Sequence, residues 1–258
     1  MPDDLINAVR PPASLEGKVS PEEWTTRVDL ATCYRLVRGN NWCDSIYNHC
    51  SARVPGEPDF MLMKAHPLLW DEVTASNLVK VNIHEELDES DGINRPGFVL
   101  HSAIMRARPD VASAVHIHEE ASTAISTTKE GLLPLTQDGI FLFEQIAYHD
   151  YQGITENAEE RNAIITNFGD KPVMLMRSHG SVTVGESVRE AYVHTTHLVK
   201  ASQIQLQLMA GGAELIIPPA EICRTAVTQH IAHGLGRGQA DWPAWQRELD
   251  RIDESYRH

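Results

Sequence analysis

The sequence lacks the long apolar run that a membrane-spanning helix requires. No stretch of about 18 consecutive apolar residues occurs in the 258-residue chain, although a helix needs roughly 20 to cross a bilayer. Residues 1–17 are acidic and lack the apolar segment of a secretory signal peptide. We therefore expect a cytoplasmic protein with no membrane partner.

Cysteine and positive charge are also scarce. The four cysteines, Cys33, Cys43, Cys50 and Cys223, show no C-x-x-C spacing, and in a cytoplasmic protein they are expected to be reduced thiols. The 22 Lys and Arg residues are outnumbered by 36 Asp and Glu, which gives a formal net charge of −14. This acidity argues against nucleic acid as a partner. A small anionic substrate remains compatible with it, because a pocket can be locally positive.

The chain mixes helical and strand patterns without a strict β–α–β alternation. Ser20 and Glu23 form a capping box with Pro21 at the first helical position, and apolar residues at helical spacing follow. Helices are expected near residues 20–39, 98–108, 121–129, 157–168, 186–209 and 245–256, and strands near 46–54, 60–63, 78–83, 112–117, 173–177 and 181–184. Residues 132–157 are expected to be irregular.

These patterns predict one α/β domain that forms a sandwich around a mixed sheet. The chain contains no internal repeat and no low-complexity segment. Residues 1–19 are expected to form an N-terminal arm and residues 20–215 the domain itself. Residues 216–258 are expected to form a helical extension that packs on the same domain.

A histidine pair ends one of the predicted strands. His116 and His118 flank Ile117, and side chains alternate between the two faces of a strand, so both imidazoles point the same way. One metal ion could bind both. With 13 histidines in the chain, such a pair is also not far from chance, and two polar side chains at a strand end are an equal alternative.

A third histidine favours the metal. His179 lies in an S-H-G turn between two apolar strands, where Gly180 is expected to let the backbone bend. Three histidines with one open coordination position are typical of a catalytic zinc site. We therefore predict one divalent metal ion per subunit, Zn²⁺ first, with Mn²⁺, Fe²⁺ or Co²⁺ as alternatives because imidazole suits several metals.

Several segments of the chain, taken in order, resemble the class II aldolase/adducin family. They are Tyr47–Gly56, Leu68–Lys80, Pro96–Val111, Val115–His118, Gly131–Gln137, Ala147–Gly153 and Val173–Gly180. The resemblance extends from about Trp24 to Gly212. It implies an α/β/α sandwich, a metal ion on the H-x-H pair and the later histidine, and a homotetramer with sites between subunits.

The chain departs from the sugar-phosphate aldolases of that family. Those enzymes carry an acid/base glutamate four residues before the histidine that is His101 here, and this position is Gly97. Their phosphate-binding serines are replaced by the run Ile93–Pro96, and their glycine–asparagine loop by Asn48-His49. The chain is more similar to the adducin-like bacterial branch, where metal-dependent decarboxylation of hydroxylated aromatic acids is one activity.

An open metal site favours chemistry that builds negative charge on substrate oxygens. Retro-aldol cleavage and decarboxylation both break a carbon–carbon bond and leave an enolate-like carbanion. Without the family glutamate, decarboxylation or a relocated base is favoured. The candidates for the acid/base are Glu119 and Tyr148, with Tyr151 equal to Tyr148. The alternatives are a helix-terminal glutamate and packed tyrosines with satisfied hydroxyls.

The substrate is expected near the loop of Asn48, His49 and Ser51. Lys64 and His66 follow the next predicted strand, and with the loop they could form a small positive pocket for a carboxylate. Lys64 by itself could equally be a solvated surface charge. His194 and His197 share a helix face, and we expect them to be interior polar groups rather than a second metal pair.

The sequence therefore predicts a metal-dependent carbon–carbon lyase, either a decarboxylase of a hydroxylated aromatic or keto acid or an aldolase. A non-catalytic scaffold like the adducin head domain is the alternative from another class. An epimerase or dehydratase on the same metal site is a further enzymatic alternative.

Overall fold

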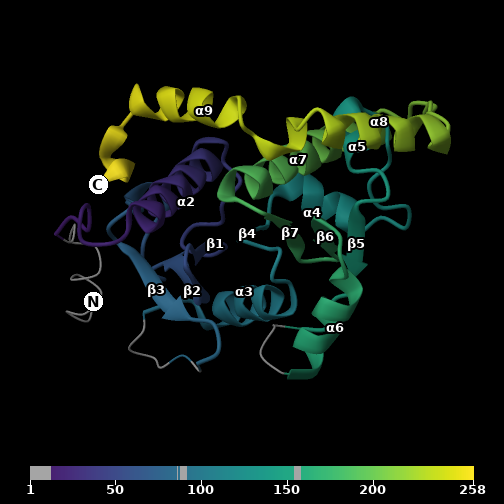
Figure 1. The fold of residues 1–258 in the computed structure, drawn as a ribbon. Coiled ribbons are helices and arrows are strands. Elements are labelled where there is room, and N and C mark those ends of the chain that lie inside the picture. The colour runs from purple at the N-terminus through teal and green to yellow at the C-terminus, as the bar shows by residue number, and fades with distance from the viewer. Residues whose placement is uncertain (1–12, 86, 88–91, 154–157) are drawn as a thin grey trace.

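A seven-stranded sheet forms the centre of the molecule (Figure 1). The computed structural model describes residues 13–85, 87, 92–153 and 158–258. The strands lie in the order β3-β2-β1-β4-β7-β6-β5, and all neighbours are antiparallel except β5 and β6. Their bounds are β1 His49–Val54, β2 Glu57–Lys64, β3 Leu78–Asn82, β4 Ser113–Ile117, β5 Ile146–His149, β6 Val173–Met176 and β7 Gly180–Gly185.

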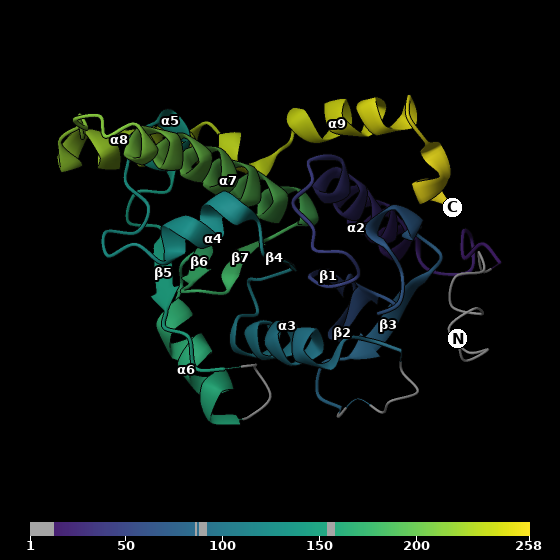
Figure 2. The same cartoon turned by 180° about the vertical axis from the view of Figure 1, so that it is seen from behind.

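Helices cover both faces of this sheet, as the two opposite views show (Figures 1 and 2). One face is covered by α3 (Arg95–Ala107) and α6 (Ala158–Phe168), and the other by α2 (Pro21–Gly39), α4 (Glu120–Ser126) and α7 (Val188–Ala210). The remaining described helices are α5 (Gln137–Phe141), α8 (Ala220–Ala232), α9 (Asp241–Asp250) and the 3-10 turns η1 (Trp70–Glu72), η3 (Leu235–Arg237) and η4 (Glu254–Arg257). The predicted single-domain α/β/α sandwich is confirmed.

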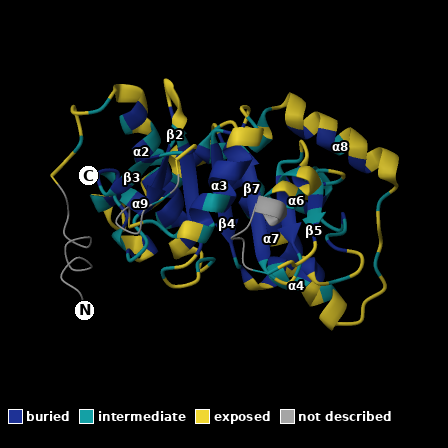
Figure 3. Ribbon diagram, turned by 90° about the horizontal axis from the view of Figure 1, so that it is seen from below, coloured by how far each residue is buried: buried dark blue, intermediate teal, exposed yellow. Residues whose placement is uncertain are grey.

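Strand β4 lies at the centre of the sheet and separates two apolar clusters. Val115 and Ile117 belong to the cluster under α2 and α7, whereas Ala114 belongs to the cluster under α3 and α6. All five residues of β4 are buried, and the strand lies in the dark blue centre of the sheet in Figure 3. Because side chains alternate along a strand, His116 points to the α3 side, opposite Ile117, as the sequence predicted.

The structure differs from the predicted elements in several places. The helix expected at 245–256 is α9, which ends at Asp250 before η4, and α8 was not among the expected helices. Helix α3 begins at Arg95, three residues earlier than expected, because Asn94 caps it by accepting the Gly97 N–H. Strand β1 begins at His49 rather than residue 46. Residues 132–157, expected to be irregular, contain α5 and β5, and β5 is a short strand that is held by pairing with β6.

The last two α-helices pack on the rest of the domain. Helix α8 contacts α5, and α9 contacts α2, where the Trp242 indole N–H donates to Asp29 at 2.8 Å. The exact limits of the arm and of the C-terminal extension stay predictions. In the described part of the chain, no helix is both long enough and apolar enough to span a membrane.

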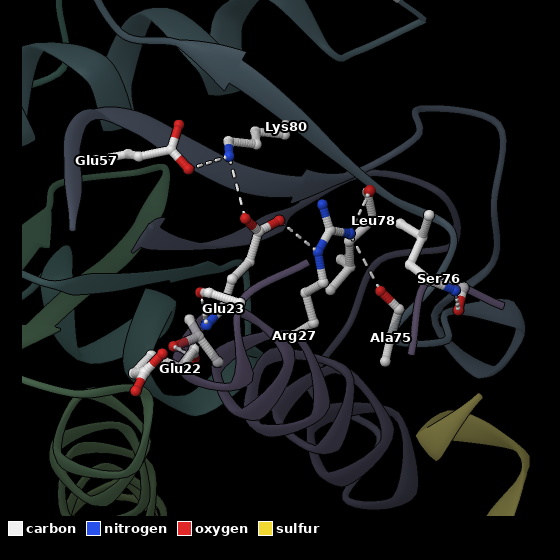
Figure 4. Close-up of polar contacts among 11 residues, drawn as sticks. Glu22, Glu23, Arg27, Glu57, Ala75, Ser76, Leu78 and Lys80 are labelled. Carbon is white, nitrogen blue, oxygen red and sulfur yellow. Dashed lines mark hydrogen bonds and ion pairs between the residues drawn. The ribbon is translucent and has the colours of Figure 1, made fainter. Parts of the chain in front are cut away.

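A buried ion-pair network fastens α2 to the sheet (Figure 4). The Ser20 hydroxyl accepts the Glu23 N–H, as a capping box requires, but the Glu23 carboxylate turns to Arg27 Nε at 2.8 Å and Lys80 Nζ at 3.0 Å. Arg27 also donates to the carbonyls of Ala75 and Leu78. Burial raises the pKa of Glu23, but the hydrogen bonds from Arg27 and Lys80 outweigh it and hold the pKa below its usual value.

Replacing Arg27 by methionine should destabilise the protein strongly. The change leaves a buried carboxylate with one partner and two carbonyls without their donor, and breaking a buried pair costs about 3–5 kcal/mol. Lys80→Met is the matched control, because Lys80 is 27% exposed and should cost about 1 kcal/mol or less. Urea unfolding gives the free energy of unfolding of both variants. Equal losses of stability in Arg27→Met and Lys80→Met would contradict the prediction that Arg27 contributes more.

Candidate metal centre

Three histidines from two segments of the chain converge at one edge of the sheet. His116 lies in β4, His118 directly follows it, and His179 lies in the turn between β6 and β7. The ring centroids of the three pairs are 4.7–5.0 Å apart. One nitrogen from each histidine lies within 4.8 Å of the others, so the structure brings together the three residues predicted as ligands.

The chemistry of these imidazoles fits a divalent metal. His116 Nδ1 lies 3.0 Å from the Ser181 carbonyl and donates to it, which leaves the Nε2 lone pair free. That Nε2 is 3.0 Å from His118 Nε2. Burial lowers the pKa of His116 well below its usual value and the pKa of His179 to about 4. Neutral rings oriented through their other nitrogen are the form in which histidine binds metals.

No fourth histidine, cysteine or carboxylate joins this group among the described residues. A carboxylate oxygen of Asp44 lies 3.8 Å from His118 Nδ1, on the far side of the ring from the converging nitrogens, where it can orient the imidazole. A metal ion held by these three histidines would therefore keep one coordination position open, as catalytic zinc sites do.

Gly180 is needed here for a different reason from the predicted one. The left-handed residue of the turn is Ser178, with φ of 60°. A Cβ on Gly180 would lie 2.4 Å from the Ile117 carbonyl oxygen and 2.8 Å from a His118 ring carbon. The glycine therefore allows the turn that carries His179 to approach the end of β4, rather than providing the bend.

The three histidines line a cavity of about 330 Å³. Asn48 and His49 line it from the start of β1, Asn94 and Pro96 from the start of α3, and Tyr151 from the segment after β5. Of the five residues predicted to bind substrate, Asn48 and His49 reach this cavity. Because the three histidines share this cavity with Asn48 and His49, it is the candidate substrate site.

Asn48 is held in a demanding conformation at the cavity. Its φ is 64°, and its side-chain oxygen accepts the backbone N–H groups of Asp44 at 3.1 Å and His118 at 3.3 Å. Its Nδ2 is buried and finds no hydrogen-bond partner among the described residues. Leaving such a donor unpaired costs about 1–3 kcal/mol, so a substrate oxygen that accepted from it would bind favourably.

His49 occupies the space beside Gly97. A Cβ on Gly97 would lie 2.4–2.5 Å from atoms of the His49 ring. The ring stacks on His116 with centroids 4.9 Å apart, and its Nδ1 is 2.8 Å from His101 Nε2. Any side chain at position 97 would therefore displace His49.

His101 was not predicted as a site residue, although it supports the site. It is fully buried and joins His49 to the hydroxyl of Ser51. Its place four residues after Gly97, on the same face of α3, was the available sequence signal. Ser51 itself contacts His101 and does not line the cavity.

Of the predicted acid/base candidates, Tyr151 lines the cavity, whereas Glu119 and Tyr148 do not. Glu119 caps α4 by accepting the Ser122 N–H at 2.8 Å, which is the alternative that the sequence left open. The Tyr148 hydroxyl accepts the Leu132 N–H at 3.0 Å, and its ring packs under Arg177. Both polar groups are thus engaged in the fold, and neither lines the cavity.

The predicted positive pocket also fails to form. Lys64 Nζ donates to the carbonyls of Ile46, His66 and Leu68 at 2.7–3.1 Å, and burial lowers its pKa to about 8. The Lys64 ammonium group therefore stabilises the backbone around residues 46 and 66–68 instead of facing the cavity. Neither Lys64 nor His66 lines the cavity. The His66 ring lies 6.0 Å, between centroids, from the ring of Tyr47, which does line it.

His194 and His197 lie away from this centre and are bonded within the fold. His194 Nδ1 donates to the Val184 carbonyl at 2.8 Å, and His197 Nδ1 pairs with Asp138 at 2.7 Å. The described residues contain one histidine cluster with metal-ligand spacing, and neither residue belongs to it.

The chain matches a known family model over most of its length. The model of the class II aldolase and adducin N-terminal domain covers residues 28–206. The chain belongs to the class II aldolase and adducin family. A Caulobacter vibrioides protein that is provisionally named an aldolase class 2 protein is 39% identical, over 98% of this chain and 99% of its own. Membership confirms the resemblance found in the sequence.

Other class II aldolase and adducin relatives differ in kind. Alpha-adducin of Rattus norvegicus is 41% identical over 85% of this chain, which spans only 31% of that adducin. An aldolase II superfamily protein from Pseudomonas syringae is 43% identical in sequence, and its crystal structure matches with a TM-score of 0.87. The match covers 95% of this chain and 100% of that one. An L-fuculose 1-phosphate aldolase from Glaciozyma antarctica PI12 matches with a TM-score of 0.80 at 24% identity, over 98% of this chain and 99% of its own. At that identity it supports the fold alone.

Proposed function

We propose that this class II aldolase-family protein is a divalent-metal-dependent carbon–carbon lyase that acts on a small anionic substrate. The observation that carries the proposal is the convergence of three neutral imidazoles, His116, His118 and His179, beside a cavity. Zn²⁺ suits this ligand set best, with Mn²⁺, Fe²⁺ and Co²⁺ as alternatives. When bound, the metal would supply a Lewis acid for negative charge on substrate oxygens.

Two residues of the chain would act on the substrate beside the metal. Asn48 would donate its unpaired Nδ2–H to a substrate oxygen. His49 would exchange the proton with the reacting carbon or oxygen, because its ring fills the space where the sugar-phosphate aldolases place their glutamate. His101 would hold His49 in place through the 2.8 Å contact between their ring nitrogens. These roles replace those first assigned to Glu119 and Tyr148.

Decarboxylation of a hydroxylated aromatic or keto acid is the favoured reaction. It needs one proton for the carbanion, whereas retro-aldol cleavage needs a base for the hydroxyl and an acid for the enolate. His49 lines the cavity beside the three proposed ligands and would supply that proton; Asp44, Tyr47 and Tyr151 are the other titratable side chains in the described lining. Aldol cleavage, epimerisation and dehydration on the same site are the alternatives that a substrate assay separates.

A non-catalytic role is the second candidate, and the 41% identity to alpha-adducin motivates it. A scaffold would have no need for three converging imidazoles at a cavity, so metal binding discriminates between the two. We further propose that the lyase is a homotetramer, as the family resemblance implies, and that it works in the cytoplasm.

The test is metal analysis followed by an activity panel. The metal-free protein should take up one Zn²⁺ per chain, and the loaded protein should release carbon dioxide from hydroxylated aromatic or keto acids. Aldehyde release from aldol adducts would instead assign it as an aldolase. A protein that binds no stoichiometric metal on reconstitution would refute the lyase and favour the scaffold.

A further inference from the structure

A network of three side chains connects the cavity to the core behind His49. His49 Nδ1 lies 2.8 Å from His101 Nε2, and His101 Nδ1 is hydrogen-bonded to the hydroxyl of Ser51. His101 and Ser51 are both fully buried, so this part of the network lies inside one subunit and does not depend on what covers the cavity. The direction of its hydrogen bonds decides which nitrogen of His49 carries a proton.

Strand β1 and helix α3 bring the three side chains together. His49 and Ser51 are two residues apart on β1 and therefore share a face. This is the α3 face, because their partners in the antiparallel ladder are His116 and Ala114, and Ala114 packs in the cluster under α3 and α6. His101 meets them from the middle of α3. Two regular elements, rather than a loop, thus hold the network.

The Ser51 hydroxyl fixes the direction of these hydrogen bonds. In the part of the chain that the structure describes, His101 Nδ1 is the one hydrogen-bond partner of this hydroxyl. If the hydroxyl accepted a proton from Nδ1, its own proton would be buried without an acceptor, which is destabilising. The Ser51 hydroxyl therefore donates to His101 Nδ1.

The remaining proton positions follow from this direction. Because His101 Nδ1 accepts a hydrogen bond, the N–H of that ring must be at Nε2. Complete burial also lowers the pKa of His101 to about 3, in keeping with a ring that carries a single proton. His101 Nε2–H then donates to His49 Nδ1, so the N–H of His49 must be at Nε2 in turn.

We propose that Ser51 and His101 are positioning residues that hold His49 as an Nε2–H donor at the cavity. The inference rests on the proposed function, which places His49 beside the substrate. His49 Nε2 lies next to Gly97, where an added Cβ would be 2.5 Å away. An N–H there can donate to negative charge that develops on the substrate. The base step of retro-aldol cleavage would need a lone pair in the same place, so this tautomer favours decarboxylation.

The first test measures the tautomer in the full-length, Zn²⁺-loaded protein labelled with nitrogen-15 in histidine. Two-bond proton–nitrogen correlation spectra distinguish a protonated from an unprotonated ring nitrogen, and His49→Gln identifies the His49 signals by their loss. We expect His49 and His101 each to carry a proton at Nε2 and none at Nδ1. A proton at Nδ1 of His49 would overturn the proposal.

Ser51→Ala tests whether the hydroxyl sets this tautomer. Without its donor, His101 can take either tautomer, so an Nδ1–H form of His49 should appear in the spectrum. Turnover should fall about two- to tenfold, in proportion to the competent fraction of His49. Ser51→Thr keeps the hydroxyl and should restore both the spectrum and the rate.

Ser113→Ala is the matched control. The Ser113 hydroxyl is also buried and donates to the Ser51 carbonyl at 2.8 Å, so the variant removes a hydroxyl beside the network and not from it. The His49 spectrum should then match that of the parent protein. An unchanged spectrum in Ser51→Ala, or the same change in Ser113→Ala, would contradict the role of Ser51.

Failure of the network and failure of the lyase give different results. A parent protein that releases no product from any substrate of the panel, but carries the His49 proton at Nε2, refutes the lyase and supports the network. Product release by a protein whose His49 proton is at Nδ1 refutes the network alone.

Discussion

His116→Ala should abolish metal binding and turnover together. His116 is buried, and its Nε2 faces His118 Nε2 at 3.0 Å, so the variant loses one of the three proposed ligands. Removing a group that merely orients a ligand costs 10- to 100-fold in metal affinity, and losing the ligand itself should cost more than about 100-fold. Turnover should fall by at least about 10³, because the Lewis acid contributes several kcal/mol.

His84→Ala is the matched control for this variant. His84 is exposed and pairs with Asp59 at the surface, so it removes one imidazole without touching the cavity. Zn²⁺ content after dialysis and the rate of product release should match the parent protein. If His116→Ala retained one tightly bound Zn²⁺ per chain, the three-histidine site would be wrong.

Gly97→Ala should lower turnover by about 10²–10⁴ while metal binding survives. The added Cβ would lie 2.4–2.5 Å from two atoms of the His49 ring. This distance is well below van der Waals contact, so the ring must move. His49 is held by His101 and by stacking on His116. Losing a positioned acid/base typically costs 10²–10⁴ in rate. His49→Ala should give a comparable loss.

Gly39→Ala serves as the control, because a Cβ there would meet no atom within 4 Å. Measuring Zn²⁺ stoichiometry beside turnover distinguishes a displaced His49 from a damaged metal site. Normal turnover in Gly97→Ala and His49→Ala would remove His49 from the reaction. Loss of metal in both would show that His49 supports His116 instead.

Local sequence patterns correctly predicted which side chains share a strand face. The alternation of His116, Ile117 and His118 along one strand predicted which side chains share a face, and the structure agrees because β4 is a regular strand with partners on both sides. The order of segments from Tyr47 to Gly180 identified the family, and with it the sandwich.

Features that depend on distant parts of the chain could not be predicted in this way. A lysine two residues before His66 suggested a pocket charge, but its reach to three carbonyls depends on how residues 46–68 fold around it. The contact of Gly97 with His49 joins positions 48 apart, so no periodicity reports it. Strand β5 is four residues long and forms through its partner β6, which a local window does not contain.

The shared volume of His49 and Gly97 has a consequence for sequence variation. Because one ring fills the space of both positions, neither can change freely while the other stays the same. A relative with a carboxylate side chain at the position of Gly97 must carry a smaller residue at that of His49, or a shifted loop. Substitutions at the two positions should therefore occur as a pair, and the identity of that pair should sort relatives by the group that carries their proton.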